Sequence, residues 1–336
     1  MPVELTSVAD DEVVVFDGPA RRHYDGLDPD TGYVLDGVEA RTSARPGELL
    51  CRFATVNDVH FGETTCGVID GTDIGPTFSV PHGAEPYPEL MNRGAVSEIA
   101  AIDPAAVLVK GDLTANGTED EYRKFRSFYE PTFGDRLHVV RGNHDSYHGG
   151  SFAAVPMQEI RLPGVCLALL DTSRDHQVNG SLSDDQIEWL DELATRCDEQ
   201  VLVFGHHPMW NPDRDQRHDD VFGLRPRSAE AMREVFLRRP RLRGYFAGHT
   251  HRNQRQRIRA SGETPWVEVA CVKDYPGTWA EYRVFEGGVL QVHRRIATPE
   301  ALAWTEQTRH MYEGGYAAYA LGSLDDRCFL IDGGRP

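Results

Sequence analysis

The feature that most constrains this chain is a series of short apolar runs, each long enough for one buried strand. In order they read LLCRFATV, AAVLVKG, LHVVRG, VCLALLD, VLVFGHH and RGYFAGH. Near-continuous apolar runs are typical of strands buried on both faces of an α/β sheet. Helical spacing lies between several of them, as in 183–196, where Ser183 is expected to cap a helix and Gln186 to complete a capping box. We therefore predict an α/β fold for the central part of the chain.

Five of these runs end in carboxylate, amide or imidazole side chains. In chain order the residues are Asp58 and His60, Asp112, Asn143 and His144, His206 and His207, and His249 and His251. Open α/β sheets bind ligands beyond the carboxyl ends of their strands, so we expect these groups to converge on one crevice. Any one of the groups alone is most often structural, but the complete ordered set favours a shared polar site.

The chemistry of this set favours metal ions. Mixed oxygen and imidazole ligands suit Mn, Fe or Zn, whereas Ca draws oxygen ligands only. Asp58 and His60 stand two positions apart, so on an extended chain both point to one side and can chelate one ion. His249 and His251 share that spacing, and at roughly 6–7 Å apart they can serve two ions about 3.5–4 Å from each other. The two oxygens of Asp112 can bridge such a pair.

The net charge and the composition limit the classes of molecule that the protein can bind. The net charge of −18 argues against stable binding to nucleic acid or to an anionic membrane. A small anionic substrate stays compatible with this charge, because bound cations can reverse the local field. The first residues, MPVELTSVADDEVVV, lack the basic and apolar regions of a secretory signal, and the six cysteines are scattered. We expect a cytoplasmic protein that does not associate with membranes.

Three regions are expected along the chain. Residues 1–48 contain the strand-like EVVVF and TGYVLDGV and are predicted to form a small β-rich appendage, which ends in the linker ARPGE. Residues 49–296 would form the α/β domain. Residues 297–336 are predicted to form a C-terminal helix and a tail rich in Gly and Tyr.

The motifs, taken together, point to one family. The ordered pattern Asp-x-His, Gly-Asp, Gly-Asn-His-Asp, Gly-His-His and Gly-His-x-His resembles the calcineurin-like metallophosphoesterase superfamily. Within it, LLDTSRDHQVNGSLSDDQIEWLDEL is similar to a segment of the class III cyclic-nucleotide phosphodiesterase branch. The resemblance covers about 49–296 and implies a four-layer α/β/β/α sandwich with a dinuclear metal centre.

The resemblance also implies two ligand sets that share one carboxylate. They are Asp58, His60, Asp112 and His251 for one ion, and Asp112, Asn143, His206 and His249 for the other. His144 would be the catalytic histidine that is not a ligand, placed near the leaving group. Asp145 would orient His144, and His207 would support the metal-binding imidazoles from outside.

The function implied is that of a phosphodiesterase with two metal ions (Mn, Fe or Zn), acting on small phosphodiesters such as 3′,5′-cyclic nucleotides. Hydrolysis would proceed by in-line attack of a hydroxide that bridges the ions. Within the same chemistry, a phosphomonoesterase or a nuclease is an alternative. From another class, the chain could be a non-catalytic metal-binding scaffold, although scaffold relatives lose ligands and this chain keeps the full set. A di-metal oxidase is disfavoured, because the Glu-rich helical motif of di-iron bundles is absent.

Three segments depart from the family pattern: the N-terminal appendage 1–48, the C-terminal extension 297–336 and the stretch that follows His60. The long Gly- and Pro-rich stretch 61–90 is expected to shape substrate access. Four side chains are candidates for lining the pocket, with a surface-loop role as the alternative: Glu63, Cys66, His82 and His148. Tyr275 and the tail RHMYEGGYAAYALG are candidates for covering the site or for a homodimer contact, and packing on the core is the plainer alternative.

Overall fold

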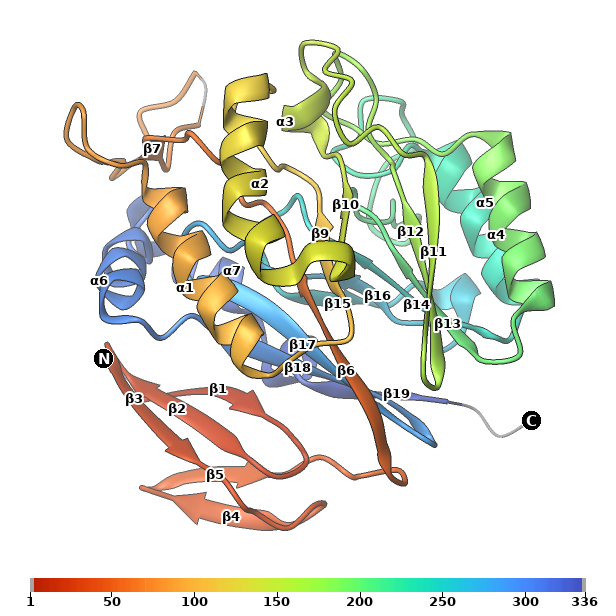
Figure 1. Ribbon diagram of the computed structural model, residues 1–336, viewed down its shortest axis with the longest axis horizontal. Coiled ribbons are helices and arrows are strands. Elements are labelled where there is room, and N and C mark those ends of the chain that lie inside the picture. The colour runs from red at the N-terminus through yellow and green to blue at the C-terminus, as the bar shows by residue number, and fades with distance from the viewer. Residues whose placement is uncertain (1–2, 70, 334–336) are drawn as a thin grey trace.

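The computed structural model describes residues 3–69 and 71–333, and its core consists of two six-stranded sheets (Figure 1). The first sheet has the strand order β10-β9-β6-β17-β18-β19, with β6 (Leu49–Val56), β9 (Val107–Lys110), β10 (Leu137–Val140), β17 (Thr278–Phe285), β18 (Gly288–Arg295) and β19 (Phe329–Asp332). The second has the order β11-β12-β13-β14-β16-β15, with β11 (Met157–Leu162), β12 (Val165–Leu170), β13 (Gln200–Phe204), β14 (Leu242–Ala247), β15 (Gln254–Gln256) and β16 (Trp266–Glu268). All six predicted apolar runs are strands.

The six runs pair mainly in parallel, as buried apolar strands do. Strands β6, β9 and β10 are parallel neighbours in the first sheet. Strands β12, β13 and β14 are parallel neighbours in the second. Parallel pairing places the carboxyl ends of the strands of one sheet at the same edge, which is where the polar groups follow.

The sheets pack face to face, and helices cover the two outer faces. Because strand side chains alternate, Phe53 of β6 and Phe204 of β13 meet between the sheets, whereas Ala54 and Val203 face outward. Helices α1 (Tyr87–Ala101) and α2 (Glu119–Phe133) cover the first sheet, and α4 (Asp184–Arg196) and α5 (Pro226–Arg238) cover the second. The expected four-layer α/β/β/α sandwich is confirmed.

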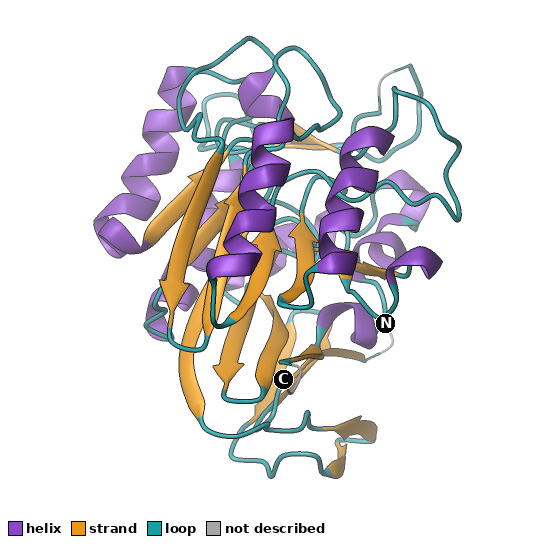
Figure 2. Ribbon diagram, turned by 90° about the vertical axis from the view of Figure 1, so that its right-hand side faces the viewer, coloured by secondary structure: helices purple, strands orange, loops and turns teal. Residues whose placement is uncertain are grey.

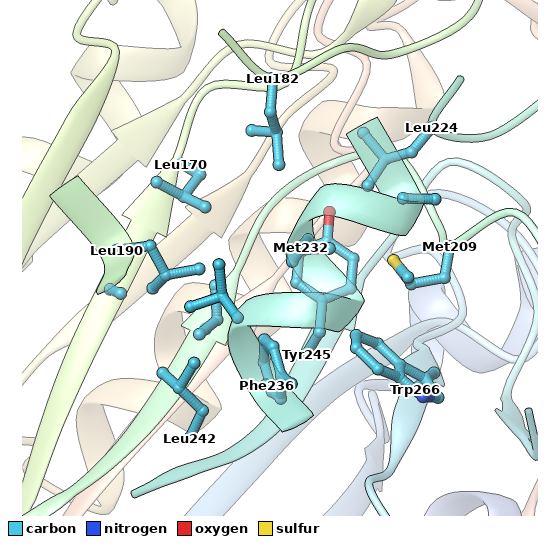
Figure 3. Packing of buried hydrophobic residues seen from close by; sticks show 14 of the residues in the cluster. Leu170, Leu182, Leu190, Met209, Leu224, Met232, Phe236, Leu242, Tyr245 and Trp266 are labelled. Atoms are coloured by element: carbon cyan, nitrogen blue, oxygen red, sulfur yellow. The ribbon is translucent and has the colours of Figure 1, made fainter. Parts of the chain in front are cut away.

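The outer layer beside the second sheet shows how the helices are anchored. Leu190 of α4 and Met232 and Phe236 of α5 pack with Tyr245 of β14 in one buried cluster (Figure 3). The start of α4 is the predicted capping box. The Ser183 hydroxyl accepts a hydrogen bond from the Gln186 amide, and the Gln186 side chain accepts one from the Ser183 amide.

The N-terminal region contains more strands than the sequence indicated. It forms a three-stranded sheet of β1 (Glu4–Val8), β2 (Val13–Asp17) and β3 (Ala20–Tyr24), followed by a hairpin of β4 (Gly32–Leu35) and β5 (Val38–Arg41). The run TGYVLDGV, read as one strand, is split between β4 and β5, because the chain turns at Asp36 and Gly37, both with positive φ.

This small β region is attached to the core by charge as well as by apolar contact. Arg283 of β17 forms ion pairs with Asp10, Asp11, Glu12 and Glu281. In Figure 1 the five strands, in red and orange, lie beneath β18. The division of the chain at residues 48 and 296 stays a prediction.

The C-terminal region completes the first sheet. It forms α6 (Pro299–Thr308), α7 (Tyr316–Leu321) and α8 (Leu324–Arg327), and then β19, which pairs with β18. A helix and a tail were expected here from the sequence. The strand was not predicted, because its four residues are too few to show the alternating pattern of a strand. The remaining short elements are β7 (Thr65–Cys66), β8 (Phe78–Ser79), α3 (Asn143–Ser146) and the 3-10 turns η1 (Gly134–Arg136), η2 (Arg259–Ser261) and η3 (Tyr312–Gly314).

The Tyr-rich tail packs on the core, which confirms the plainer of the alternatives for it. Tyr275 and Tyr316 are buried in one cluster with Cys66 and Tyr87. This cluster also joins the 61–90 stretch to the tail, because Phe78 packs against it. In the described part of the chain, no helix combines the length and the apolar character needed to cross a membrane.

Candidate metal centre

The seven predicted ligands come from the same end of the two sheets. Asp58 and His60 follow β6, Asp112 follows β9 and Asn143 follows β10, all in the first sheet. His206 follows β13, and His249 and His251 follow β14, in the second sheet. The loops that leave this end gather at the top of Figure 2. The crevice therefore lies between the two sheets of the sandwich.

One group of ligands forms around Asp58. Asp58, His60 and His251 each offer a ligand atom, and these atoms lie within 4.8 Å of one another. Nε2 of His251 is 3.5 Å from Oδ1 of Asp58. Asp112 approaches this group from the neighbouring strand, with its Oδ2 atom 3.4 Å from Nε2 of His60. These four residues are the set predicted for the first ion.

The second group forms around His206. Its Nε2 atom lies 3.0 Å from Oδ1 of Asn143 and 3.3 Å from Oδ2 of Asp112. Nδ1 of His206 donates a hydrogen bond to the Lys110 carbonyl at 2.8 Å, which leaves Nε2 to face the site. His249 offers a ligand atom within 4.8 Å of one from His206. The residues predicted for the second ion are thus also brought together, and Asp112 belongs to both groups.

The backbone of the site is held in a conformation that side chains other than glycine seldom adopt. Five of the seven predicted ligands have positive φ: Asp58 at 52°, His60 at 47°, Asp112 at 51°, His249 at 70° and His251 at 55°. Each such residue costs on the order of 1–3 kcal/mol. Strain of this kind concentrates at functional sites, where the surrounding fold enforces it.

Gly111 lies where the backbone of the first sheet meets an imidazole of the second. Gly111 precedes Asp112 and has φ +90°, and a Cβ built on it would lie 2.5 Å from Nδ1 of His206. The backbone of the first sheet therefore passes directly against an imidazole of the second. No side chain fits at this approach.

The charges of the site fit bound cations. Burial raises the pKa of Asp58, but His251 and His206 hold that pKa below its ordinary value. Burial lowers the pKa of His206, but Asp112 and Asp58 raise it to about 9. Both ring nitrogens of His60 are buried, and each faces a carboxylate without an aligned hydrogen bond to it, Nδ1 that of Glu63 at 3.2 Å and Nε2 that of Asp112 at 3.4 Å. Buried carboxylates facing imidazole nitrogens are an environment that positive charge stabilises, and metal ions would supply that charge.

His249 presents a neutral ring to the site. Burial and His206 lower its pKa to about 3. Its Nε2 atom donates to the Phe222 carbonyl at 2.7 Å, so Nδ1 is the nitrogen left for a metal. Phe222, which the sequence analysis did not single out, also stacks on the His249 ring with a centroid distance of 4.1 Å.

His207 has the supporting position expected of it. Although its ring lies close to those of His206 and His249, both of its nitrogens are engaged. Nδ1 contacts the Thr172 hydroxyl at 2.8 Å, and Nε2 contacts the Val178 carbonyl at 3.1 Å. With both nitrogens engaged in these hydrogen bonds, His207 has none left for a metal ion.

His144 lies beside the ligands, but Asp145 does not contact its ring as expected. The ring centroids of His144 and His60 are 4.5 Å apart. Nδ1 of His144 donates to the Ala115 carbonyl at 2.7 Å, and this contact replaces the one expected with Asp145. Asp145 instead accepts hydrogen bonds from the backbone amides of Leu113, Thr114 and Gly142. It orders the loops that carry the ligands, and its burial leaves it no surface toward the crevice.

The other four residues that the sequence suggested for the pocket lie in different places. His82 and His148 are exposed in loops, and Cys66 is buried in the cluster under the tail. Glu63 does contact a predicted ligand, with Oε2 3.2 Å from Nδ1 of His60. Its partner Lys273 went unnoticed, because an ion pair between residues 210 positions apart leaves no local signal.

Tyr147 was also missed. Its hydroxyl accepts a hydrogen bond from Nδ2 of Asn143 at 2.6 Å, which turns Oδ1 of that amide toward His206. Tyr147 follows His144 within the same loop segment, so only its place next to the Gly-Asn-His-Asp motif could have suggested it.

A cavity of about 250 Å³ adjoins the second ligand group. Its walls include Trp210, Arg214, His218, Phe222 and Thr250. Phe222 is 58% exposed although its ring covers a metal-site imidazole. The lining also includes basic and acidic side chains in equal number, so the apolar face of Phe222 is the feature that suits the organic part of a ligand.

Comparison with known proteins gives consistent results. A family model described as calcineurin-like phosphoesterase matches residues 51–253. The 3′,5′-cyclic adenosine monophosphate phosphodiesterase CpdA of Pseudomonas aeruginosa is 30% identical over 183 residues, which cover 51% of this chain and 63% of the relative. A probable glycerophosphodiester phosphodiesterase, GpdQ of Arcobacter nitrofigilis, is 26% identical and covers 44% and 57%. The matches span about three fifths of the length of these relatives.

A solved structure shows the same fold. A dimetal phosphatase from Danio rerio superposes with a TM-score of 0.55 at 17% sequence identity. The superposition covers 74% of this chain and 98% of that chain.

Proposed function

The chain belongs to the calcineurin-like phosphoesterase family, and on that premise we propose that it is a metal-dependent hydrolase of small phosphodiesters. The observation that carries the proposal is the position of Asp112, whose Oδ2 atom lies 3.4 Å from Nε2 of His60 and 3.3 Å from Nε2 of His206. One carboxylate between two imidazole-containing groups is the arrangement that two adjacent cations require.

The side chains divide into two sets of ligands. Asp58, His60, Asp112 and His251 would hold one ion, and Asp112, Asn143, His206 and His249 the other. When bound, the ions would polarise the phosphate oxygens and lower the pKa of a water for attack on phosphorus. The same nitrogen and oxygen donors accept Mn, Fe or Zn, and cellular supply contributes to the choice among them.

His144 would act on the leaving group. Its Nδ1–H is fixed on the Ala115 carbonyl, so Nε2 is the nitrogen available to substrate. Burial holds the pKa of His144 below its ordinary value, and Asp112 offsets this only in part. In its protonated form, Nε2 can donate a proton to the oxygen that departs from phosphorus. Its backbone amide donates to Oδ1 of Asp112 at 2.9 Å, which fixes the distance between this histidine and the shared carboxylate.

The cavity beside Phe222 supports a substrate with an organic substituent on the phosphate. The exposed aromatic face of Phe222 next to His249 offers a stacking surface for a planar group such as a nucleobase. The similarity to a 3′,5′-cyclic adenosine monophosphate phosphodiesterase supports the same substrate class.

A hydrolysis screen of the Mn- and Fe-loaded protein tests the proposal. We expect turnover of 3′,5′-cyclic nucleotides and of bis(p-nitrophenyl) phosphate, and slower turnover of p-nitrophenyl phosphate. Faster hydrolysis of p-nitrophenyl phosphate would favour a phosphomonoesterase. Turnover of diesters without any cyclic nucleotide would remove the nucleotide assignment. No turnover by a protein that binds two ions would favour the scaffold alternative.

A further inference from the structure

We propose that Glu63, held by Lys273, is a positioning residue for the metal ligand His60. Its carboxylate would accept the Nδ1 hydrogen of His60 and so direct Nε2 toward the ion. The inference rests on the metal centre of the proposed function, but not on any substrate.

The geometry places a carboxylate on the far side of the His60 ring from the site. Oε2 of Glu63 lies 3.2 Å from Nδ1 of His60, and Nε2 on the opposite side of the ring lies 3.4 Å from Asp112. The Glu63 amide also donates to the His60 carbonyl at 3.1 Å, which closes a turn and keeps the carboxylate beside the ring. A carboxylate that accepts from the outer nitrogen of a metal-bound histidine fixes its tautomer and raises its basicity as a ligand.

Lys273 holds this carboxylate from the other side. Its Nζ atom donates to both oxygens of Glu63, at 2.8 and 2.7 Å. The side chain of Lys273 is only 6% exposed, and that of Glu63 19%. Burying such a pair is costly, and an apolar pair of similar volume often stabilises a fold as well. Stability alone therefore does not explain why this ion pair is buried. Its position against the metal ligand His60 does, because the Glu63 carboxylate can orient the ring.

Lys273 is itself fixed by the C-terminal region. Its backbone carbonyl accepts a hydrogen bond from the indole of Trp304 in α6 at 3.1 Å. Trp304 stacks on Tyr87 at a centroid distance of 4.5 Å, and the Tyr87 hydroxyl lies 3.4 Å from the Lys273 Nζ atom. A helix outside the family match therefore supports a ligand of the first ion through three residues.

The direct test is the variant Glu63→Gln, which keeps the shape of the side chain and removes its charge. Metal affinity is measured by competition with a chromophoric chelator, without substrate. We expect the affinity for one of the two ions to fall roughly tenfold to a hundredfold, as for other partners of metal-bound histidines. The affinity for the other ion should be unchanged. Glu188→Gln, an exposed glutamate on α4, is the matched control and should bind both ions as the wild type does.

Three further variants keep the test decisive. Glu63→Asp retains the charge but withdraws it from Nδ1, and should show the same loss for one ion. Lys273→Met should weaken that ion as well, with exposed Lys124→Met as its control. In the double variant with His60→Ala, Glu63→Gln should add no further loss, because Glu63 acts through His60. Equal weakening of both ions, full additivity, or unchanged affinity in folded Glu63→Gln would overturn the proposal. These measurements stand even if no phosphodiester is hydrolysed.

Discussion

Oδ2 of Asp112 lies 3.3 Å from Nε2 of His206, and this contact joins the two sheets of the sandwich at the candidate site. Asp112 follows β9 in the first sheet, and His206 follows β13 in the second. The same carboxylate oxygen is 3.4 Å from His60, which belongs to the other ligand group. Correct assembly of the two sheets is therefore a condition for the site, and ligands from either sheet alone would not complete it.

His144→Ala should separate catalysis from metal binding. His144 lies against His60 but its Nε2 atom is not needed as a ligand, so both ions should remain bound. We expect kcat on bis(p-nitrophenyl) phosphate to fall by about 10²–10⁴, the usual contribution of a positioned proton donor. His148→Ala, an exposed histidine in the same loop, is the control and should leave kcat unchanged. Unaltered turnover in His144→Ala would remove this residue from the mechanism.

Gly111→Ala should damage the site through backbone geometry. The added Cβ would meet His206 at 2.5 Å, so the imidazole or the strand end must move. We expect loss of at least one bound ion, measured by metal analysis of the purified protein. Gly262→Ala is the matched control, because Gly262 also has positive φ but open space around the position of a Cβ. Its metal content should be normal, and a normal content in Gly111→Ala would contradict the geometry described for Asp112 and His206.

Arg283→Met should destabilise the fold far more than a surface charge deletion. Arg283 is 5% exposed and pairs with Asp10, Asp11, Glu12 and Glu281. Removing it takes one cation from a buried network in which Arg45 and Arg294 remain, so we expect the free energy of unfolding to fall by about 3 kcal/mol, the lower end for a broken buried pair. Denaturation by urea measures the change. Arg123→Met breaks an exposed pair with Asp120 and should cost no more than about 1 kcal/mol. Equal effects would show that the N-terminal strands are not held by this network.

We expect the burial of Glu89 to make the stability of the protein depend on pH. It is 3% exposed, its Oε2 atom has no hydrogen-bond partner among the described residues, and burial raises its pKa from the ordinary 4.5 to about 7. Since the folded pKa exceeds the unfolded one, the wild type loses stability as pH rises from about 4.5 and the loss is complete above about 7. Glu89→Gln abolishes this loss, so its Tm relative to wild type should rise between pH 5 and pH 8 in metal-free buffer.

The matched variant for this pH experiment is again Glu188→Gln, which changes an exposed glutamate. Its Tm relative to wild type should be the same at both pH values. A constant difference for Glu89→Gln as well would show that Glu89 is ionised in the folded protein at pH 5 and above.

The sequence was sufficient to predict that the seven candidate ligands lie close together and, through the family resemblance, to predict the layers of the fold. Apolar strands such as VLVFG can be recognised from their local composition. The polar residue that follows each strand, such as Asp112 after β9, can then be read directly from the sequence. Parallel pairing then brings such residues to one edge, a consequence of geometry that needs no long-range information.

What the sequence did not show depends on contacts between distant residues. The partner of Glu63 is 210 positions away, and that of Asp10 is 273 positions away. The neighbour of the His144 ring was assigned to adjacent Asp145, whereas the fold supplies the Ala115 carbonyl from another loop. Strand β19 was missed because only pairing with β18 makes its four residues a strand. Each of these facts is set by tertiary packing.

The most direct test of the dinuclear site is anomalous diffraction from a crystal grown with excess manganese. The account predicts two peaks about 3.5–4 Å apart, with the carboxylate of Asp112 between them and His60 and His206 on opposite sides. A single peak, or two peaks that do not share Asp112, would contradict it.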